Sequence, residues 1–217
     1  MAFKQIDLDN WPRQEIFNHF MDLGTTFNLT RRLDITILTE IMKTDQVKLY
    51  PALIYTITQT MNDRVNFRLD YNQAGEFGYW EELQPLYTIL NPTTKLFSGV
   101  VTPLSATYRQ FQSAYLADVE QYRQSQQLFP QGVAPTNIVN ISMIPWTDFS
   151  AFSLQNAHEP NYLRPIVTIG QFEKSAGRVL LPVALQAHHA VIDGYDAAWF
   201  FNQLQIRLTN FLTELSK

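Results

Sequence analysis

The sequence predicts a single α/β domain over residues 1–217, a two-layer sandwich in which a mixed β-sheet carries helices mainly on one face. Segments with helical periodicity are interleaved with segments that alternate apolar and polar residues, the pattern of strands. The expected hairpins are antiparallel, and together with the interleaved helices they favour a mixed sheet. The 217 residues are 46% hydrophobic, enough for one large core or two small ones, and no linker or repeat divides them.

The first part of the chain predicts two helical stretches, a strand and a hairpin. A helix begins at residues 9–12, where Asp or Asn can cap it and Pro suits an early position, and continues through Phe20. Alternation at 33–38 predicts a short strand, and the apolar spacing from there to Met61 predicts a helix. Residues 66–80 predict a hairpin that turns at Asn-Gln-Ala-Gly.

The rest of the chain predicts five more strands and two long helices. The strands are expected at 86–90, 96–101, 137–144, 166–172 and 178–188, the last two joined by a turn at 173–177. One helix is expected at 106–127, where breakers follow it. The last helix, 193–212, has an apolar stripe formed by Ala197, Phe200, Phe201, Leu204, Leu208 and Phe211.

Composition excludes several classes of protein. The net charge of −4 without a basic block gives no support for nucleic-acid binding, and the absence of cysteine excludes disulfides and thiolate catalysis. Residues 1–10 lack the apolar run of a signal peptide, and no window approaches a membrane span, so we expect a cytoplasmic protein without a membrane partner. Only 17% of residues are charged and 13% are aromatic, which fits a subunit interface, a ligand pocket or simply a large core.

The segment 186–194, Gln-Ala-His-His-Ala-Val-Ile-Asp-Gly, is the most informative in the chain. It follows an apolar strand and precedes a helix, a junction where polar side chains often form sites. It holds His188 and His189, followed by Asp193 and by Gly194, which permits a tight bend. Taken alone, these residues can equally be a partly buried histidine pair and a helix cap.

A metal site at this segment is less favoured. The two remaining histidines, His19 and His158, lie far away in sequence, and a histidine metal site normally recruits further ligands. We therefore expect no metal.

The string His-His-x-x-x-Asp-Gly after a strand resembles the active-site signature of chloramphenicol acetyltransferases. The wider fold group of CoA-dependent acyltransferases, which includes dihydrolipoamide acyltransferases and condensation domains, shares this signature. Further segments resemble the same family in its order and spacing and extend the resemblance over essentially all 217 residues: Asn10-Trp11-Pro12-Arg13, Phe27-Asn28-Leu29-Thr30, Tyr50-Pro51, Leu128-Phe129-Pro130-Gln131-Gly132, Asn140-Ile141-Ser142, Pro145-Trp146 and Pro165-Ile166-Val167-Thr168.

The resemblance implies an enzyme that inactivates chloramphenicol by moving an acetyl group from acetyl-CoA to one of its hydroxyls. His189 matches the family's general base, which acts without an acyl-enzyme. Ser142 matches the hydroxyl that stabilises the oxyanion, and Thr168 matches a threonine that assists through a bound water. Asp193 and Arg13 match a buried ion pair that holds the active-site loop. Without the resemblance, we would interpret Ser142 and Thr168 as ordinary strand hydroxyls and Arg13 as a surface arginine.

The resemblance also implies two binding regions and a homotrimer whose active sites lie between subunits. The antibiotic pocket is expected to include Phe20, Thr25, Phe27, Phe97, Phe129 and Leu154. The CoA-binding residues are expected to be Pro145, Trp146 and Phe172. Phe20 and Phe172 stand where well-known relatives have tyrosine, and Thr25 stands where some have cysteine, which affects fine specificity rather than the chemistry.

Two alternatives stay open. A dihydrolipoamide acyltransferase core shares the fold and signature, but it predicts a lipoyl domain and linker upstream, whereas this chain begins almost at the catalytic domain. A non-catalytic antibiotic-binding relative is disfavoured because His189, Ser142, Thr168 and Asp193 are all present. An acetyltransferase built from hexapeptide repeats is excluded because the sequence has no such period.

Overall fold

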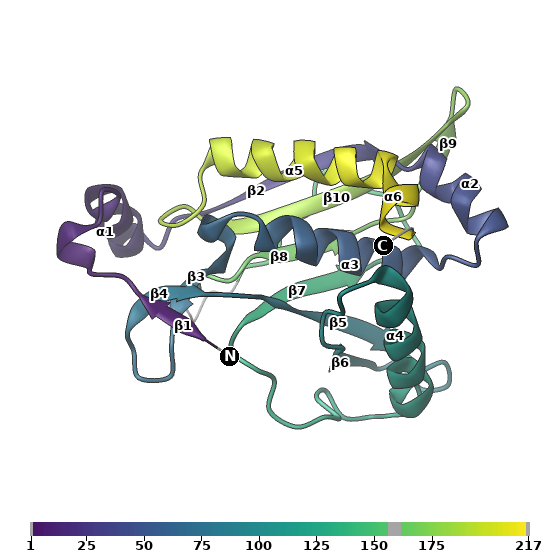
Figure 1. Cartoon of the computed structure of the whole chain (residues 1–217), viewed down its shortest axis with the longest axis horizontal. Helices are drawn as coiled ribbons and strands as arrows, with labels where there is room; N and C mark the ends of the chain where they lie inside the picture. The colour runs from purple at the N-terminus through teal and green to yellow at the C-terminus, as the bar shows by residue number, and fades with distance from the viewer. Residues whose placement is uncertain (1, 156–161, 216–217) are drawn as a thin grey trace.

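The structure, a computed structural model, describes residues 2–155 and 162–215 (Figure 1). His158 lies outside the described residues. The strands are β1 Phe3–Gln5, β2 Thr26–Asp34, β3 Leu69–Tyr71, β4 Phe77–Trp80, β5 Gln84–Leu90, β6 Phe97–Val101, β7 Ile138–Met143, β8 Ile166–Ile169, β9 Glu173–Ser175 and β10 Arg178–His188. The helices are α1 Gln14–Leu23, α2 Thr36–Thr44, α3 Leu49–Asn62, α4 Tyr108–Tyr122, α5 Gly194–Thr209 and α6 Phe211–Leu215, with 3-10 turns η1 Leu8–Asn10 and η2 Val65–Arg68.

The main sheet is mixed, as predicted. Its strand order is β2-β10-β8-β7-β5-β6, with β9 paired to the start of β10. β7 is parallel to both β5 and β8, and the other pairs are antiparallel. A small second sheet, β1-β4-β3, contains the predicted hairpin, which turns at Asn72–Gly75.

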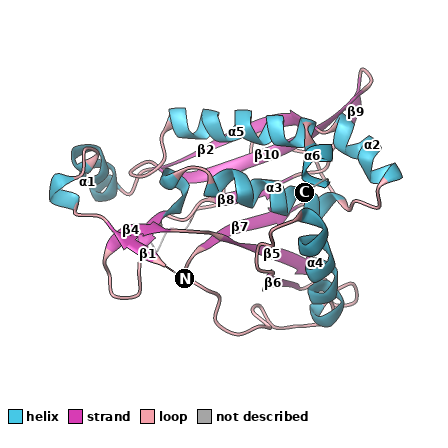
Figure 2. Ribbon diagram, viewed as in Figure 1, coloured by secondary structure: helices cyan, strands magenta, loops and turns pink. Residues whose placement is uncertain are grey.

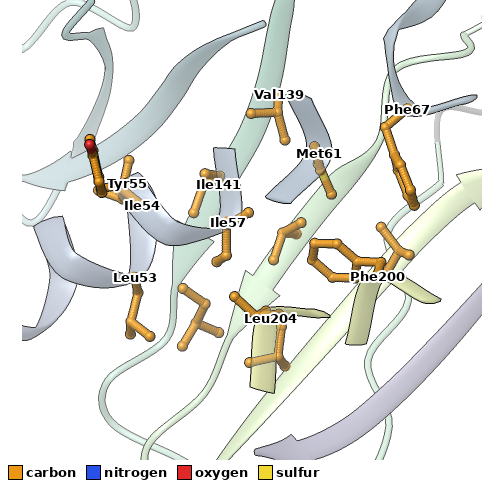
Figure 3. Close-up of a cluster of buried hydrophobic side chains, with 14 of the residues drawn as sticks. Leu53, Ile54, Tyr55, Ile57, Met61, Phe67, Val139, Ile141, Phe200 and Leu204 are labelled. Atoms are coloured by element: carbon orange, nitrogen blue, oxygen red, sulfur yellow. The ribbon is translucent and has the colours of Figure 1, made fainter. Parts of the chain in front are cut away.

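Helices α3 and α5 pack on the main sheet (Figures 1 and 2). α3 contacts α5, β5 and β7, so it is buried nearly all round. Within it, the hydroxyls of Thr56, Thr58 and Thr60 donate to carbonyls four residues earlier at 2.7–2.8 Å, which satisfies polar groups that no water can reach. Figure 3 shows Ile57 and Met61 of α3 beside Phe200 and Leu204 of α5. The predicted apolar stripe of the last helix therefore faces the core.

The alternation of β10 distinguishes the two faces of the main sheet. Leu181, Val183 and Leu185 belong to the core beneath the helices, so Ala184 and His188 point to the opposite face.

The segment after β7 covers part of that opposite face. A Cβ at Gly170 would lie 2.8 Å from the ring of Phe149, and Ser153 Oγ donates to Gln186 Oε1 at 3.3 Å. The helices therefore lie mainly on one face, and a loop covers part of the other.

Three predictions about the first elements are wrong. The strand expected at 33–38 ends at Asp34, and a helix, α2, follows it. The carboxylate of Asp34 accepts hydrogen bonds from both the N–H and the hydroxyl of Thr36, and this local turn starts the helix. The helix expected from there to Met61 is divided into α2 and α3 by residues 45–48. Helix α1 begins at Gln14 rather than near residue 10, because residues 8–10 form a 3-10 turn capped by Asp7.

The turn expected at 173–177 is shorter than predicted. Glu173–Ser175 form β9, and only Ala176 and Gly177 make the tight turn, both with positive φ. The helix expected at 106–127 ends earlier, at Tyr122. The other predicted strands are confirmed with small shifts of their ends. The helix expected at 193–212 is confirmed as far as Thr209, and a separate short helix, α6, follows it.

Candidate active site

The loop after β10 presents His189. The N–H of His189 donates to the carbonyl of Thr25 at 2.8 Å, and the N–H groups of Val191 and Ile192 both donate to the carbonyl of His188. These bonds make the chain reverse tightly directly after the strand. They also bring the start of β2 beside the histidine pair.

The two histidines have different surroundings. His188 is 2% exposed, and its Nδ1 accepts the N–H of Ala190 at 3.2 Å, so its ring belongs to the loop scaffold. The ring of His189 stacks on Phe20, with centroids 4.0 Å apart, and meets the edge of Phe27 at 5.5 Å. The Nδ1 atom of His189 is buried without a hydrogen-bond partner in the described part of the chain. Nε2 is therefore the ring nitrogen that stays accessible.

Arg13 fixes the carbonyl side of this loop. Its Nη1 lies 3.1 Å from Asp193 Oδ2, its Nε donates to the Ala190 carbonyl at 3.1 Å, and its Nη2 reaches the His189 carbonyl at 3.5 Å. The predicted pair thus forms between residues 180 positions apart. It is half-buried rather than buried, with side chains 17% and 34% exposed.

Asp193 is a helix cap as well as an ion-pair partner. Its Oδ1 accepts the N–H groups of Tyr195 and Asp196, and its Oδ2 takes Arg13. Partial burial raises the pKa of Asp193, but the Asp196 N–H and the Arg13 guanidinium outweigh this effect and hold the pKa below its usual range. Asp193 is therefore both the helix cap and the ion-pair partner considered in the sequence analysis.

Gly194 needs no special backbone conformation. Its φ is not among the positive values, and a Cβ there would meet no atom of another described residue within 4 Å. The expectation that its freedom permits the bend is wrong, since the loop hydrogen bonds already provide it.

Ser142 and Thr168 lie together on the main sheet. They are register partners on β7 and β8, and their hydroxyl oxygens are 3.3 Å apart. Thr168 pairs in turn with Ala184 on β10. Partners across strands share a face, so both hydroxyls lie on the face opposite the helices.

A pocket of about 550 Å³ opens beside Ser142. It brings together five residues predicted for the reaction or for binding: Phe97, Ser142, Pro145, Trp146 and Leu154. The pocket also contains Tyr50 and Tyr115, which sequence reasoning did not assign to a site because their helical spacing is that of core residues. Burial raises the pKa of Tyr115 to about 12, so its hydroxyl stays protonated at neutral pH.

Other predicted residues lie elsewhere. Phe20, Thr25 and Phe27 surround His189 and not the pocket. Phe129 packs over Gly99 of β6, where a Cβ would lie 3.0 Å from its ring.

Phe172 lines a separate cavity of about 580 Å³ between α2 and the β9–β10 hairpin. A single chain therefore distributes the predicted binding residues over four places: around His189, in the pocket beside Ser142, over Gly99 and in the cavity at Phe172.

No group of three or more histidines and carboxylates that could hold a metal ion occurs among residues 2–155 and 162–215. None of the helices in the same ranges is long and apolar enough to cross a membrane. The cytoplasmic location stays a prediction.

The family model described as chloramphenicol acetyltransferase matches residues 1–205. The chain belongs to the chloramphenicol acetyltransferase family. A chloramphenicol acetyltransferase of Staphylococcus aureus is 45% identical over 205 residues, covering 94% of this chain and 95% of that protein. One from Clostridium perfringens is 35% identical and covers 100% of both chains. The resemblance found in the sequence is confirmed.

Solved structures show the same fold. A chloramphenicol acetyltransferase superposes with a TM-score of 0.87 at 18% identity, covering 95% of this chain and 100% of that one. The Azotobacter vinelandii dihydrolipoamide acetyltransferase superposes with a TM-score of 0.67 at 16% identity, covering 93% and 88%. The predicted likeness to acyltransferases of this fold group is confirmed.

Proposed function

We propose that this chain inactivates chloramphenicol by transferring an acetyl group to it from acetyl-CoA, with His189 as the general base. The observation that carries the mechanism is the setting of the His189 ring. Its backbone is held on both sides, its face is stacked on Phe20, and its Nδ1 is buried. Such a ring is oriented before substrate arrives, which is what efficient proton transfer requires.

The reaction is a direct attack of an alcohol on a thioester. His189 Nε2 takes the proton of the chloramphenicol hydroxyl while the hydroxyl oxygen bonds to the acetyl carbonyl carbon. The tetrahedral intermediate carries a negative oxygen, to which the Ser142 hydroxyl donates a hydrogen bond. The intermediate then collapses, the carbon–sulfur bond breaks, and the departing thiolate of CoA receives the proton from the imidazolium. Thr168, 3.3 Å from Ser142, assists through a bound water.

One chain cannot bring His189 and Ser142 to the same substrate. His188 lies four residues beyond Ala184 on β10, or about 13 Å, and Ser142 lies two strands from Ala184, or about 10 Å. These estimates separate the two regions by about 16 Å, whereas both groups must lie about 3 Å from the reacting atoms. In Figure 1, α1 and the start of α5 lie at the left, and α4 and β6, which line the pocket, lie at the lower right.

A homotrimer resolves this separation. In a closed ring of identical chains, one end of each chain meets the other end of its neighbour. His189 of one copy then reaches the Ser142 pocket of the next, where Phe97 and Leu154 receive the antibiotic. Pro145 and Trp146 lie at the same pocket and contact CoA, and a molecule as long as CoA extends to Phe172 in the separate cavity.

The test is release of CoA thiol from acetyl-CoA by the purified protein, with and without chloramphenicol. Release that depends on chloramphenicol, and that is lost in His189→Ala, supports the proposal. The control is Gln73→Ala, in the exposed turn between β3 and β4, which should keep the wild-type rate. No release from the folded protein would refute the function, and near-normal release from His189→Ala would refute the mechanism.

A further inference from the structure

We propose that Asp196, together with Arg64 and Asn66, forms a second clamp that positions the loop bearing His189. The first clamp is Arg13, through its contacts with the carbonyls of His189 and Ala190. The inference deepens the proposed function, because it rests on the role of His189 as the base. These three are positioning residues, since they act through the loop and not on the substrate.

Asp196 is a buried carboxylate with partners on both of its oxygens. It stands at the third position of α5 and is 2% exposed. Its Oδ1 lies 2.7 Å from both Nε and Nη2 of Arg64, and its Oδ2 accepts from Asn66 Nδ2 and from the N–H of Asp193, both at 3.1 Å. A buried charge is stable only when it is paired and hydrogen-bonded, and this one is.

Asn66 joins this carboxylate to the loop. Its amide nitrogen has two hydrogens and two acceptors, Asp196 Oδ2 and the carbonyl of Val191, each at 3.1 Å. The clamp therefore holds the carbonyl of Val191 and the N–H of Asp193. These groups bracket the last two peptide bonds of the loop before α5 begins.

The two clamps divide the loop between them. Arg13 takes the carbonyls of His189 and Ala190, and Asn66 takes the carbonyl of Val191. Three successive carbonyls of the loop are thus held by side chains from outside it. A buried loop needs such partners for its polar groups, but here each partner also limits how far the His189 backbone can move.

Helix capping alone does not explain this arrangement. A capping box uses one acceptor of the third residue, for the N–H of the cap residue. Arg64 occupies the other oxygen, and its guanidinium also lies over the rings of Tyr195 and Trp199, at 5.0 and 5.2 Å from their centroids. Asn66 directs its second hydrogen at the loop and not at the helix. The contacts of Arg64 and Asn66 are not part of a capping box, and they hold the loop that bears His189.

The test compares three variants of the full protein. Asp196→Asn removes the charge, and Asn66→Ala removes only the amide bridge, so it serves if the first variant folds poorly. The matched control is Asp70→Asn, which removes the charge of another buried carboxylate, Asp70 of β3, 2.6 Å from Arg164 Nε. It makes the same substitution at a carboxylate whose ion pair does not include the loop that bears His189.

We expect Asn66→Ala and Asp196→Asn to lower kcat by about 10- to 100-fold, because misplacement of a catalytic group by about 1 Å has effects of this size. KM for both substrates should change much less, and Asp70→Asn should keep the wild-type kcat. The histidine ring signals of labelled protein, assigned with His189→Ala, provide a readout that does not depend on activity. The His189 signals should shift in both clamp variants and stay in place in Asp70→Asn.

The outcomes separate this inference from the proposed function. Wild-type kcat in both clamp variants, or unshifted His189 signals, would overturn the clamp even if the enzyme is active. If the wild-type protein does not acetylate chloramphenicol, the function fails, and the ring signals alone decide whether the clamp positions His189.

Discussion

Mixing two inactive variants tests whether His189 and Ser142 act from different copies of the chain. His189→Ala removes the base, which is worth about 10²- to 10⁴-fold in rate. Ser142→Ala removes an oxyanion donor, which is worth about 10²- to 10³-fold. Each variant alone should therefore have about 1% of wild-type activity or less. Both substitutions should leave the core intact, since His189 and Ser142 lie outside the cluster of buried hydrophobic residues.

The structure sets the expected recovery. Each site of a cyclic trimer takes His189 from one copy and Ser142 from the next. In a random mixture of equal amounts, both positions of a site are intact with a probability of one half each, so about a quarter of the sites are restored. If both residues acted from one chain, every site would contain one substitution, and the mixture would stay at the residual level.

The assay is thiol release after the two differently tagged variants are co-expressed and purified through both tags. Purification through both tags retains only mixed trimers, in each of which one of the three sites is restored, so release at about a third of the wild-type rate is expected. Mixing the variants after assembly, without subunit exchange, is the control and should give only the residual rate. Residual activity in the co-expressed sample, with both chains present in one oligomer, would refute a site shared between copies.

Three further substitutions probe the fold around the site. Arg13→Ala should cost about 2 kcal/mol at pH 7, less than a fully buried pair, because Asp193 is one-third exposed. The pKa of Asp193 is depressed in the folded state, so the loss of stability in Arg13→Ala should be complete above pH ~4 and shrink as pH falls below it. Thermal unfolding at fixed protein concentration measures this loss. An equal loss of stability at pH 3 would contradict the prediction. Gly170→Ala should lower the melting temperature, since its Cβ would lie 2.8 Å from Phe149 and overpacking costs about 1–3 kcal/mol. Thr107→Ala should cost about 1 kcal/mol in urea unfolding by removing the cap of α4, and Thr107→Ser should not.

The sequence predicted the parts of the fold in which burial follows a simple period. Every residue of the stripe in the last helix is buried, because one face of α5 and α6 lies on the core. β2 was missed although Phe27, Leu29 and Leu33 alternate with polar residues, because Arg31 interrupts the apolar face and only Leu33 of this edge strand is buried. Buried Ile35, Leu38 and Ile41 have a spacing of three, but a short alternating run concealed it.

Site residues could be predicted from the sequence where they lie close together along the chain, and not where distant segments meet. The His-His-x-x-x-Asp-Gly string is local, and so is the Asp-x-x-Asp spacing of residues 193 and 196 that forms the capping box. Contacts between distant segments have no periodicity to reveal them. Arg13 was found only through the resemblance, and Arg64 and Asn66 were not found at all, since 132 and 130 residues separate them from Asp196.

Gly194 provides an independent test of whether the loop faces another molecule. In the single chain its side-chain position is open, and its backbone suits any residue. Gly194→Ala at the first turn of α5 should therefore leave the folded chain unharmed or stabilise it by about 0.4–1 kcal/mol. If a neighbouring copy or the substrate occupies that space, the same substitution should lower kcat/KM or weaken the oligomer while the fold persists. Size-exclusion chromatography and steady-state kinetics distinguish these two effects. A variant with unchanged assembly and unchanged kinetics would show that the space stays open in the working enzyme, and that the His189 loop meets its substrate without a close approach at this glycine.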